Sequence, residues 1–189
     1  MKPVISPTIT EAIEFSLLAH KDQLRNDDRP YIIHPLSVGF ILQSAGYSES
    51  VIVAGILHDV VEDTEYSEED IKEKFGEKIS RLVAGVTDDK SITDWTERKR
   101  AYLDHLRISN DDVRAISAAD ILDNRRAILR SLEHGIDIWK TFFATPEMII
   151  KDSEERLSIV KSLDNDITRE LEVLINKLKE TLDLEGIPA

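Results

Sequence analysis

Residues 56–64, with the sequence ILHDVVEDT, decide the fold because they place four ionisable side chains inside an apolar segment. Ser48 can open a helix here, and the chain from Ser48 to Val61 is apolar nearly all round, which predicts a central, buried helix. Burying four ionisable groups requires a bound cation or an extensive polar network. A solvated His-Asp pair at the acidic end of a helix is the simpler alternative, but the apolar flanks argue against it.

Helical spacing indicates what these side chains can do together. His58 and Glu62 are four residues apart, as are Asp59 and Asp63, so both pairs would project to neighbouring parts of one helix face. His58 and Asp59 offer an imidazole nitrogen and a carboxylate oxygen to one divalent ion. Glu62 and Asp63 would lie one turn further along, where they can orient or deprotonate a water ligand of that ion.

Two further ligands are expected from separate helices. His34 precedes Pro35, which disfavours helical geometry at His34 and places it at a helix entrance. Asp120 lies among small and apolar residues that permit close approach of another helix, and Asn124 falls one turn along on the same face. Each signal is weak alone, but two His and two Asp from three helices would form a mixed nitrogen–oxygen site.

The remaining pattern predicts an all-α protein. Only 7 Gly and 6 Pro, with plentiful Leu, Ile, Glu, Lys and Arg, favour helices over a turn-rich β architecture. A first helix would begin at Thr8 or Thr10, another would span residues 35–45 and end near Gly46, and residues 87–94 would form a surface loop. Further helices are expected over residues 67–75, 79–86, 95–108 and 111–132.

The C-terminal part has apolar residues at spacings of three and four from Leu157 to Leu182. This pattern predicts a long amphipathic helix over residues 153–184, which the sequence DND at residues 164–166 can break. Its apolar stripe can cover the core of its own chain, which is the more common arrangement. Alternatively, it can pair with a second copy of the chain in a homo-oligomer.

Composition and charge exclude several functional classes. With no linker or repeat, the 189 residues suit a single domain over residues 1–189. The net charge of -13 repels phosphate backbones, so we expect no nucleic-acid partner. The chain has no cysteine, which excludes disulfides, thiolate catalysis and cysteine-based metal sites. Without an apolar run of roughly 18 residues or a leader-like N-terminus, we expect a cytoplasmic protein with no membrane contact.

The order His34, then His58-Asp59, then Asp120 resembles the ligand order of the HD-domain superfamily of metal-dependent phosphohydrolases. More narrowly, the chain resembles the (p)ppGpp hydrolase domain of RelA/SpoT-type enzymes and the stand-alone small alarmone hydrolases. The likeness covers approximately residues 10–130. The matching stretches are residues 19–20 with Gln23 and Arg25, then 30–35, 57–64, 75–76, 82–87, and 119–120 with Leu122 and Asn124.

This resemblance implies an HD-domain helical bundle that binds one divalent ion, usually manganese. It implies hydrolysis of the 3′-pyrophosphate of ppGpp or pppGpp, which gives GDP or GTP and pyrophosphate. It also implies roles for particular side chains: metal binding by His34, His58, Asp59 and Asp120, catalysis by Glu62 and Asp63, and nucleotide binding by Arg25 and Asn124.

Several positions depart from the family pattern, and all of them reduce the positive charge near the site. Ser117 and Ile121 stand where the family commonly has Lys and Arg, Asn26 replaces a basic residue, and two acids follow Thr87. Loss of a cation removes charge-assisted contacts to phosphate. Four nearby cations can compensate for the loss: Lys21, Lys90, Arg125 and Arg126.

If they do not compensate, the same chemistry would act on a different phosphorylated nucleotide or dinucleotide. A separate alternative is a non-catalytic nucleotide-binding or regulatory domain that retains the metal. The intact pair of Glu62 and Asp63 argues against a non-catalytic domain, because a sensor does not need to activate water.

Overall fold

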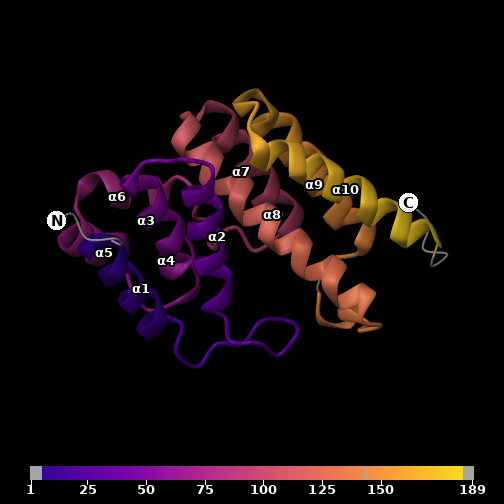
Figure 1. Cartoon of the computed structure of the whole chain (residues 1–189), viewed down its shortest axis with the longest axis horizontal. Helices are drawn as coiled ribbons and strands as arrows, with labels where there is room; N and C mark the ends of the chain where they lie inside the picture. Colours follow the sequence, from indigo (N-terminus) through magenta and orange to yellow (C-terminus); the bar gives the residue numbers. More distant parts are fainter. Residues whose placement is uncertain (1–5, 143, 185–189) are drawn as a thin grey trace.

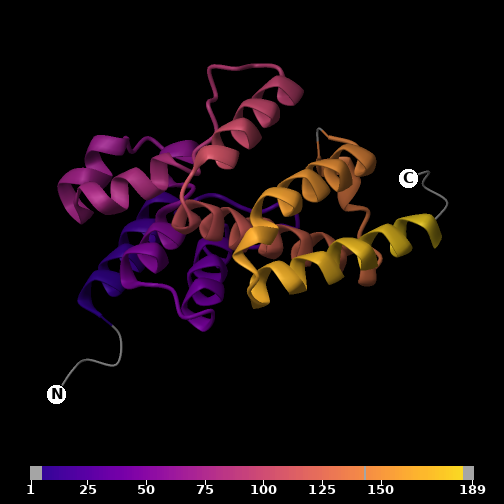
Figure 2. The ribbon, with the colours of Figure 1, turned by 90° about the horizontal axis from the view of Figure 1, so that it is seen from above.

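The computed structural model describes residues 6–142 and 144–184, and within them it confirms the all-α class. Figures 1 and 2 show an elongated molecule with the first six helices at one end and α9 and α10 at the other. The long helix α8 runs between the two ends. The α-helices are α1 (Pro7–Ala19), α2 (Ile33–Ser44), α3 (Glu49–Leu57), α4 (Val60–Asp63), α5 (Glu68–Phe75), α6 (Glu77–Ala84), α7 (Trp95–Ile108), α8 (Asp111–Glu133), α9 (Pro146–Val160) and α10 (Asp166–Leu184).

Helix α3 is the central, buried helix that the sequence predicts. Every residue from 51 to 57 is buried, and α3 packs against α1, α2, α6 and α8. Its Gly55 permits close contact with α2, because a Cβ there would lie 2.4 Å from Cδ1 of Leu42. This contact holds the end of α3 beside the first turn of α2, so that His58 and His34 come together.

The start of α1 differs from the prediction of a cap at Thr8 or Thr10. The helix begins at Pro7, and Ser6 is its cap, accepting a hydrogen bond from the N–H of Ile9. Proline is well suited to the first position of a helix, where its missing N–H costs nothing. Thr8 and Thr10 therefore lie inside the first turn.

The start of α2 also differs, since the helix begins at Ile33 instead of Pro35. His34 is therefore helical, and the prediction that Pro35 keeps it out of helical geometry is wrong. Proline is tolerated here because the first N–H groups of a helix have no partner within the helix. The predicted end near Gly46 is confirmed, since α2 ends at Ser44 and Gly46 has a positive φ of 79°.

The predicted continuous helix through residues 48–61 is divided into α3 and α4 by His58 and Asp59. The Nδ1 atom of His58 lies 2.8 Å from the carbonyl oxygen of Gly55. In a continuous helix that carbonyl would accept the N–H of Asp59, so the side chain of His58 competes for it. The break turns Asp59 toward His34 and separates α4 from α3.

The C-terminal part forms two helices, joined by a short 3₁₀ turn (Lys161–Leu163) and by Asp164, whose φ is 42°. The predicted break is confirmed, but the expected helix over residues 153–184 is wrong at its start, since α9 begins at Pro146. Helix α10 packs its apolar face against α8 and α9 of the same chain. Pairing of this helix with a second chain stays a prediction. Across the described residues, no helix is long and apolar enough to cross a membrane.

Candidate active site

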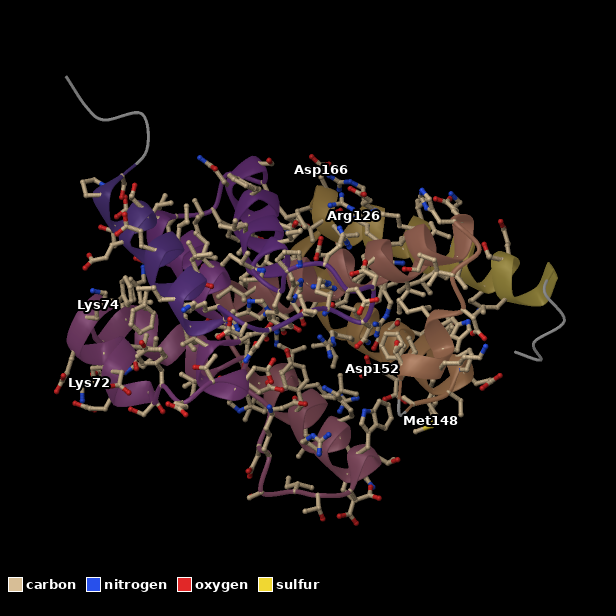
Figure 3. The ribbon with its side chains drawn as sticks, turned by 90° about the horizontal axis from the view of Figure 1, so that it is seen from below. Lys72, Lys74, Arg126, Met148, Asp152 and Asp166 are labelled. Atoms are coloured by element: carbon tan, nitrogen blue, oxygen red, sulfur yellow. The ribbon has the colours of Figure 1, made fainter. Side chains whose placement is uncertain are left out.

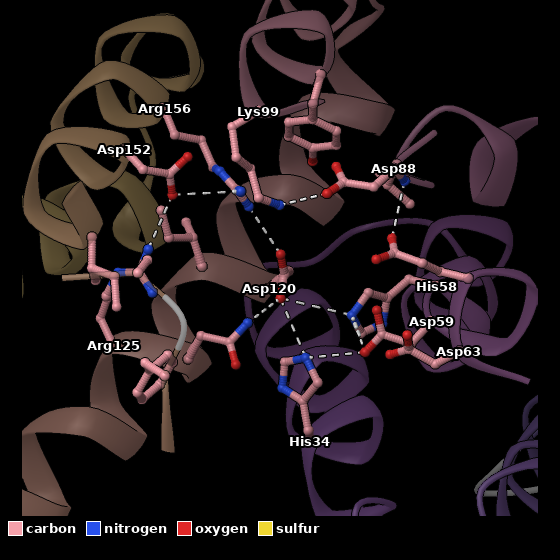
Figure 4. Close-up of a pocket in the computed structure, with 18 of the residues that line it drawn as sticks. His34, His58, Asp59, Asp63, Asp88, Lys99, Asp120, Arg125, Asp152 and Arg156 are labelled. Atoms are coloured by element: carbon pink, nitrogen blue, oxygen red, sulfur yellow. Dashed lines mark hydrogen bonds and ion pairs between the residues drawn. The ribbon is translucent and has the colours of Figure 1, made fainter. Parts of the chain in front are cut away.

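Four of the predicted side chains meet where α2, α8 and the turn between α3 and α4 converge (Figure 4). Nε2 of His34 lies 3.4 Å from Oδ2 of Asp59 and 3.3 Å from Oδ1 of Asp120. Nε2 of His58 lies 3.1 Å and 3.7 Å from the same two oxygens. The nearest ligand atoms of His34, His58 and Asp120 all lie within 4.8 Å of one another, and both imidazoles are buried.

The hydrogen bonds of the two imidazoles leave their Nε2 atoms directed at this cluster. Nδ1 of His58 faces the carbonyl oxygen of Gly55, which can only accept, so Nδ1 carries the proton. Nδ1 of His34 lies 2.7 Å from Oδ2 of Asp123. A carboxylate in this position keeps the proton on Nδ1, so that Nε2 can bind a metal ion. Nε2 of His58 is buried and has no hydrogen-bond partner among the described residues.

A divalent cation fits this donor set. Two imidazole lone pairs and two carboxylates repel one another unless positive charge lies between them, and this mixture of ligands suits several transition metals. Atoms bound to one ion at about 2.1 Å lie about 3.0–3.5 Å apart, close to the separations seen here. Burial opposes a charged His58, but Asp59 and Asp120 outweigh it and raise the pKa of His58 well above its usual value. The cluster therefore favours positive charge at its centre.

Glu62 and Asp63 lie beside this cluster and face the same cavity. The Tyr31 hydroxyl connects Asp63 to the cluster, at 2.6 Å from Oδ2 of Asp59 and 3.0 Å from Oδ2 of Asp63. Burial raises the pKa of Glu62 to about 7, although the N–H of Asp88 donates a hydrogen bond to its carboxylate and opposes the rise. A carboxylate with a pKa near 7 is suited to accept a proton at neutral pH.

The cavity over the cluster has a volume of about 290 Å³ and opens beside a second chamber of about 270 Å³. Tyr31, Asn124, Arg125 and Phe142 line both chambers. Arg25 lines the second chamber and donates a hydrogen bond to Asn124 at 2.9 Å. The structure therefore brings Arg25 and Asn124 together at the junction of the two chambers, and their role in nucleotide binding stays a prediction.

Asp88 corrects the prediction that residues 87–94 form only a surface loop. Its side chain is buried and forms an ion pair with Lys99 of α7 at 2.6 Å. Its N–H donates to Glu62, while Lys90 donates to Oδ1 of Asp63 at 2.6 Å. The loop is therefore part of the site, where it holds both predicted catalytic carboxylates.

The wall opposite the imidazoles has a buried network of charged residues from α8 and α9 (Figure 4). Nη2 of Arg125 lies 3.1 Å from Oδ2 of Asp152, and Nη1 of Arg156 lies 3.0 Å from Oδ2 of Asp120. Arg125 is one of the four cations expected to compensate. Of the others, Arg126 pairs with Glu170 away from Asp152 (Figure 3), Lys21 lines neither chamber, and Lys90 contacts Asp63.

Sequence reasoning assigned no role to several residues of the site: Tyr31, Asp88, Lys99, Asp123, Asp152 and Arg156. Asp123 could have been found, because it lies three residues after Asp120 and therefore near it on the helix surface. Tyr31 could have been found within the quoted stretch 30–35. Lys99 and Arg156 follow the ordinary pattern of charges on amphipathic helices, and nothing in the sequence indicates their burial.

Comparison with known proteins agrees with this geometry. A family model described as an HD domain matches residues 12–144. The guanosine-3′,5′-bis(diphosphate) 3′-pyrophosphohydrolase MESH1 of Drosophila melanogaster is 38% identical over 125 residues, covering 64% of this chain and 69% of the relative. The enzyme of that name from Aquifex aeolicus is 38% identical over 128 residues, which are 67% of this chain but only 18% of the relative. This chain therefore spans under a fifth of the length of the Aquifex relative.

Two solved structures share the fold. One is described as a metazoan ortholog of SpoT that hydrolyses ppGpp; it has a TM-score of 0.74 and 28% identity, and the match covers 99% of this chain and all of the other. A protein of Listeria monocytogenes has a TM-score of 0.71 and 32% identity, with 77% and 97% covered. Since the family model matches well over half of the residues, and the ligands lie together in space, this chain belongs to the HD-domain family.

Proposed function

We propose that this protein is a metal-dependent phosphohydrolase that removes the 3′-pyrophosphate of ppGpp or pppGpp. The observation that carries the proposal is one cavity that holds both the His-Asp cluster and the carboxylates of Glu62 and Asp63. The relatives named for this activity are similar over 64–67% of the chain. A non-catalytic nucleotide-binding domain would have no use for a carboxylate whose pKa lies near 7 beside such a cluster.

We propose that His34, His58, Asp59 and Asp120 bind the ion, and that the ion is manganese. The tautomers of both histidines and the convergence of two carboxylate oxygens support these ligands. Nitrogen and oxygen ligands in equal number suit manganese, although they also suit iron or zinc. When bound, the ion would polarise the attacking water and neutralise negative charge at the attacked phosphate.

The residues of the chain would then carry out the proton transfers. Glu62 accepts a proton from a water molecule. At the same time the oxygen of that water forms a bond to the phosphorus attached to the ribose 3′ oxygen. The bond from that phosphorus to the 3′ oxygen breaks, the 3′ oxygen takes up a proton, and pyrophosphate leaves. Asp63, held by Tyr31 and Lys90, orients the water, so that proximity contributes to the rate.

The two chambers suggest how a nucleotide would lie. Its pyrophosphate would occupy the chamber over the cluster, and its nucleoside would occupy the second chamber beside Arg25 and Asn124. Apolar side chains of Ile128, Ile138 and Phe142 line that second chamber and suit the face of a base. We also propose that the enzyme works in the cytoplasm.

A second substrate class is favoured by the charge around the site. Ser117 and Ile121 contribute no positive charge, and the buried cations of the cavity are each paired with a carboxylate. A different phosphorylated nucleotide or a nicotinamide dinucleotide phosphate would need fewer such contacts. The site and the chemistry are the same for both classes.

One experiment separates these functions. Manganese-loaded protein is incubated with ppGpp, pppGpp, pApp and NADPH, and the products are identified by mass spectrometry. Pyrophosphate release from ppGpp and pppGpp supports the proposal, whereas turnover of only pApp or NADPH supports the second class. Binding without turnover of any of them contradicts both. Glu62→Gln and Asp63→Asn are the matched inactive variants, and full activity in both would contradict their assigned roles.

A further inference from the structure

Arg156 is a buried arginine with far fewer hydrogen bonds than its guanidinium can make. The side chain is 7% exposed, yet within residues 6–142 and 144–184 only one of its five N–H groups forms a hydrogen bond, from Nη1 to Oδ2 of Asp120 at 3.0 Å. Nη2 lies 3.7 Å from Oδ2 of Asp152, and Nε has no partner among the described residues. A buried donor without an acceptor costs free energy, so such a group calls for an explanation.

The position of Arg156 explains these unpaired donors, because its side chain lines the cavity over the His-Asp cluster (Figure 4). The guanidinium lies over the ring of Tyr102, with 4.8 Å from Cζ to the ring centroid. The Tyr102 hydroxyl in turn donates to Oγ of Ser117 at 2.8 Å. Ile121 lines the same cavity. Helix α9 therefore brings a cation into the cavity that Ile121 lines, with Tyr102 between this cation and Ser117.

Asp120 connects this cation to the reaction centre through its two oxygens. Oδ1 faces the imidazoles of His34 and His58, while Oδ2 faces Arg156. The guanidinium is thus one carboxylate away from the cluster, with unused N–H groups on a side chain that lines the cavity. A phosphate oxygen offers such a guanidinium charge-assisted hydrogen bonds.

We propose that Arg156 binds a phosphate oxygen of the substrate and is a specificity-determining residue of this site. The inference rests on the proposed function for the identity of the substrate, but it requires only a phosphorylated ligand. Arg156 would supply from α9 the positive charge that positions 117 and 121 of α8 lack. The competing explanation is that Arg156 only holds Asp120 in place for the ion.

The test compares Arg156→Met, which removes the charge but retains length, with Arg156→Lys, which retains the charge. Arg126→Met is the control, since Arg126 forms an exposed ion pair with Glu170 outside this cavity. Three quantities are measured for each: KM and kcat for ppGpp, the affinity for inorganic pyrophosphate by calorimetry, and the affinity for Mn²⁺.

Arg156→Met is expected to raise KM and to weaken pyrophosphate binding by roughly tenfold to a hundredfold. Arg156→Lys should recover most of the loss, and Arg126→Met should stay within about twofold of wild type. Pyrophosphate affinity unchanged in Arg156→Met would overturn the proposal. The proposal would also be overturned if Arg156→Met lost Mn²⁺ affinity to the same extent and regained its full pyrophosphate affinity at saturating Mn²⁺. Arg156 would then act only through Asp120.

A second measurement uses the wild-type protein and does not depend on how Arg156→Met folds. With diamagnetic Mg²⁺ bound, the Nε–H resonance of Arg156, assigned by its absence in Arg156→Lys, is followed by NMR as pyrophosphate is added. The resonance should shift and saturate, and an unmoved resonance at saturation would overturn the proposal. A shift in a protein that hydrolyses none of the nucleotides would sustain this inference while refuting the proposed function.

Discussion

Glu62 is expected to make the metal-free protein less stable as the pH rises. Burial raises its pKa from the usual 4.5 to about 7. A carboxyl group whose pKa is raised by folding contributes its full stability below about pH 4.5, and that contribution is lost as the pH rises through about 7. Worked from these two values, the loss between pH 5 and pH 8 is about 2–3 kcal/mol. Glu62→Gln stays neutral at every pH and should not show this loss.

The assay is urea denaturation in the presence of a chelator at pH 5 and pH 8. Other groups titrate in this range, so the quantity of interest is the difference in unfolding free energy between Glu62→Gln and wild type. That difference should grow in favour of the variant by about 2–3 kcal/mol from pH 5 to pH 8. Glu65→Gln, at an exposed glutamate three residues away, should change by less than about 0.5 kcal/mol. A difference for Glu62→Gln that is the same at both pH values would refute the reasoning.

Three other substitutions test the support around the site. Tyr31→Phe removes the hydroxyl between the two carboxylates and should lower kcat about tenfold or more with an unchanged circular dichroism spectrum; unaltered kcat would contradict this. Asp123→Ala removes the partner of His34 and should weaken Mn²⁺ binding by about tenfold to a hundredfold in calorimetry, and an unchanged affinity would count against it. Gly55→Ala puts a Cβ 2.4 Å from Leu42 and should cost about 1–3 kcal/mol in urea denaturation, whereas a more stable protein would show that the two helices can move apart.

Much of the fold follows from local pattern, and the exceptions have identifiable causes. Helix α7 has the predicted bounds, and α8 ends one residue later than predicted, because both carry regular apolar spacing between polar caps. The break after α3 could not be predicted, since it depends on a side chain of His58 that bonds to a carbonyl of its own helix. The start of α9 was missed because residues 146–152 precede the region of clear periodicity.

The residues of the site also fall into those that the local sequence predicts and those whose role depends on the fold. The ligands and the Glu62-Asp63 pair could be predicted because they come from contiguous motifs in which charge occurs among apolar residues. Arg156 could not, because an arginine on an amphipathic helix is usually solvated, and its burial depends on how α9 packs on α7 and α8. Asp88 was missed for a related reason, since only the fold brings Lys99 next to it.

The measurement that tests the central claim most directly is hydrolysis of ppGpp by the manganese-loaded protein in water enriched in ¹⁸O. Mass spectrometry of the products reports both the bond that breaks and the atom that water attacks. Attack at the phosphorus on the 3′ oxygen predicts GDP without label and pyrophosphate that carries one ¹⁸O atom per turnover. Label in GDP, or no turnover of ppGpp by the loaded protein, would contradict the account.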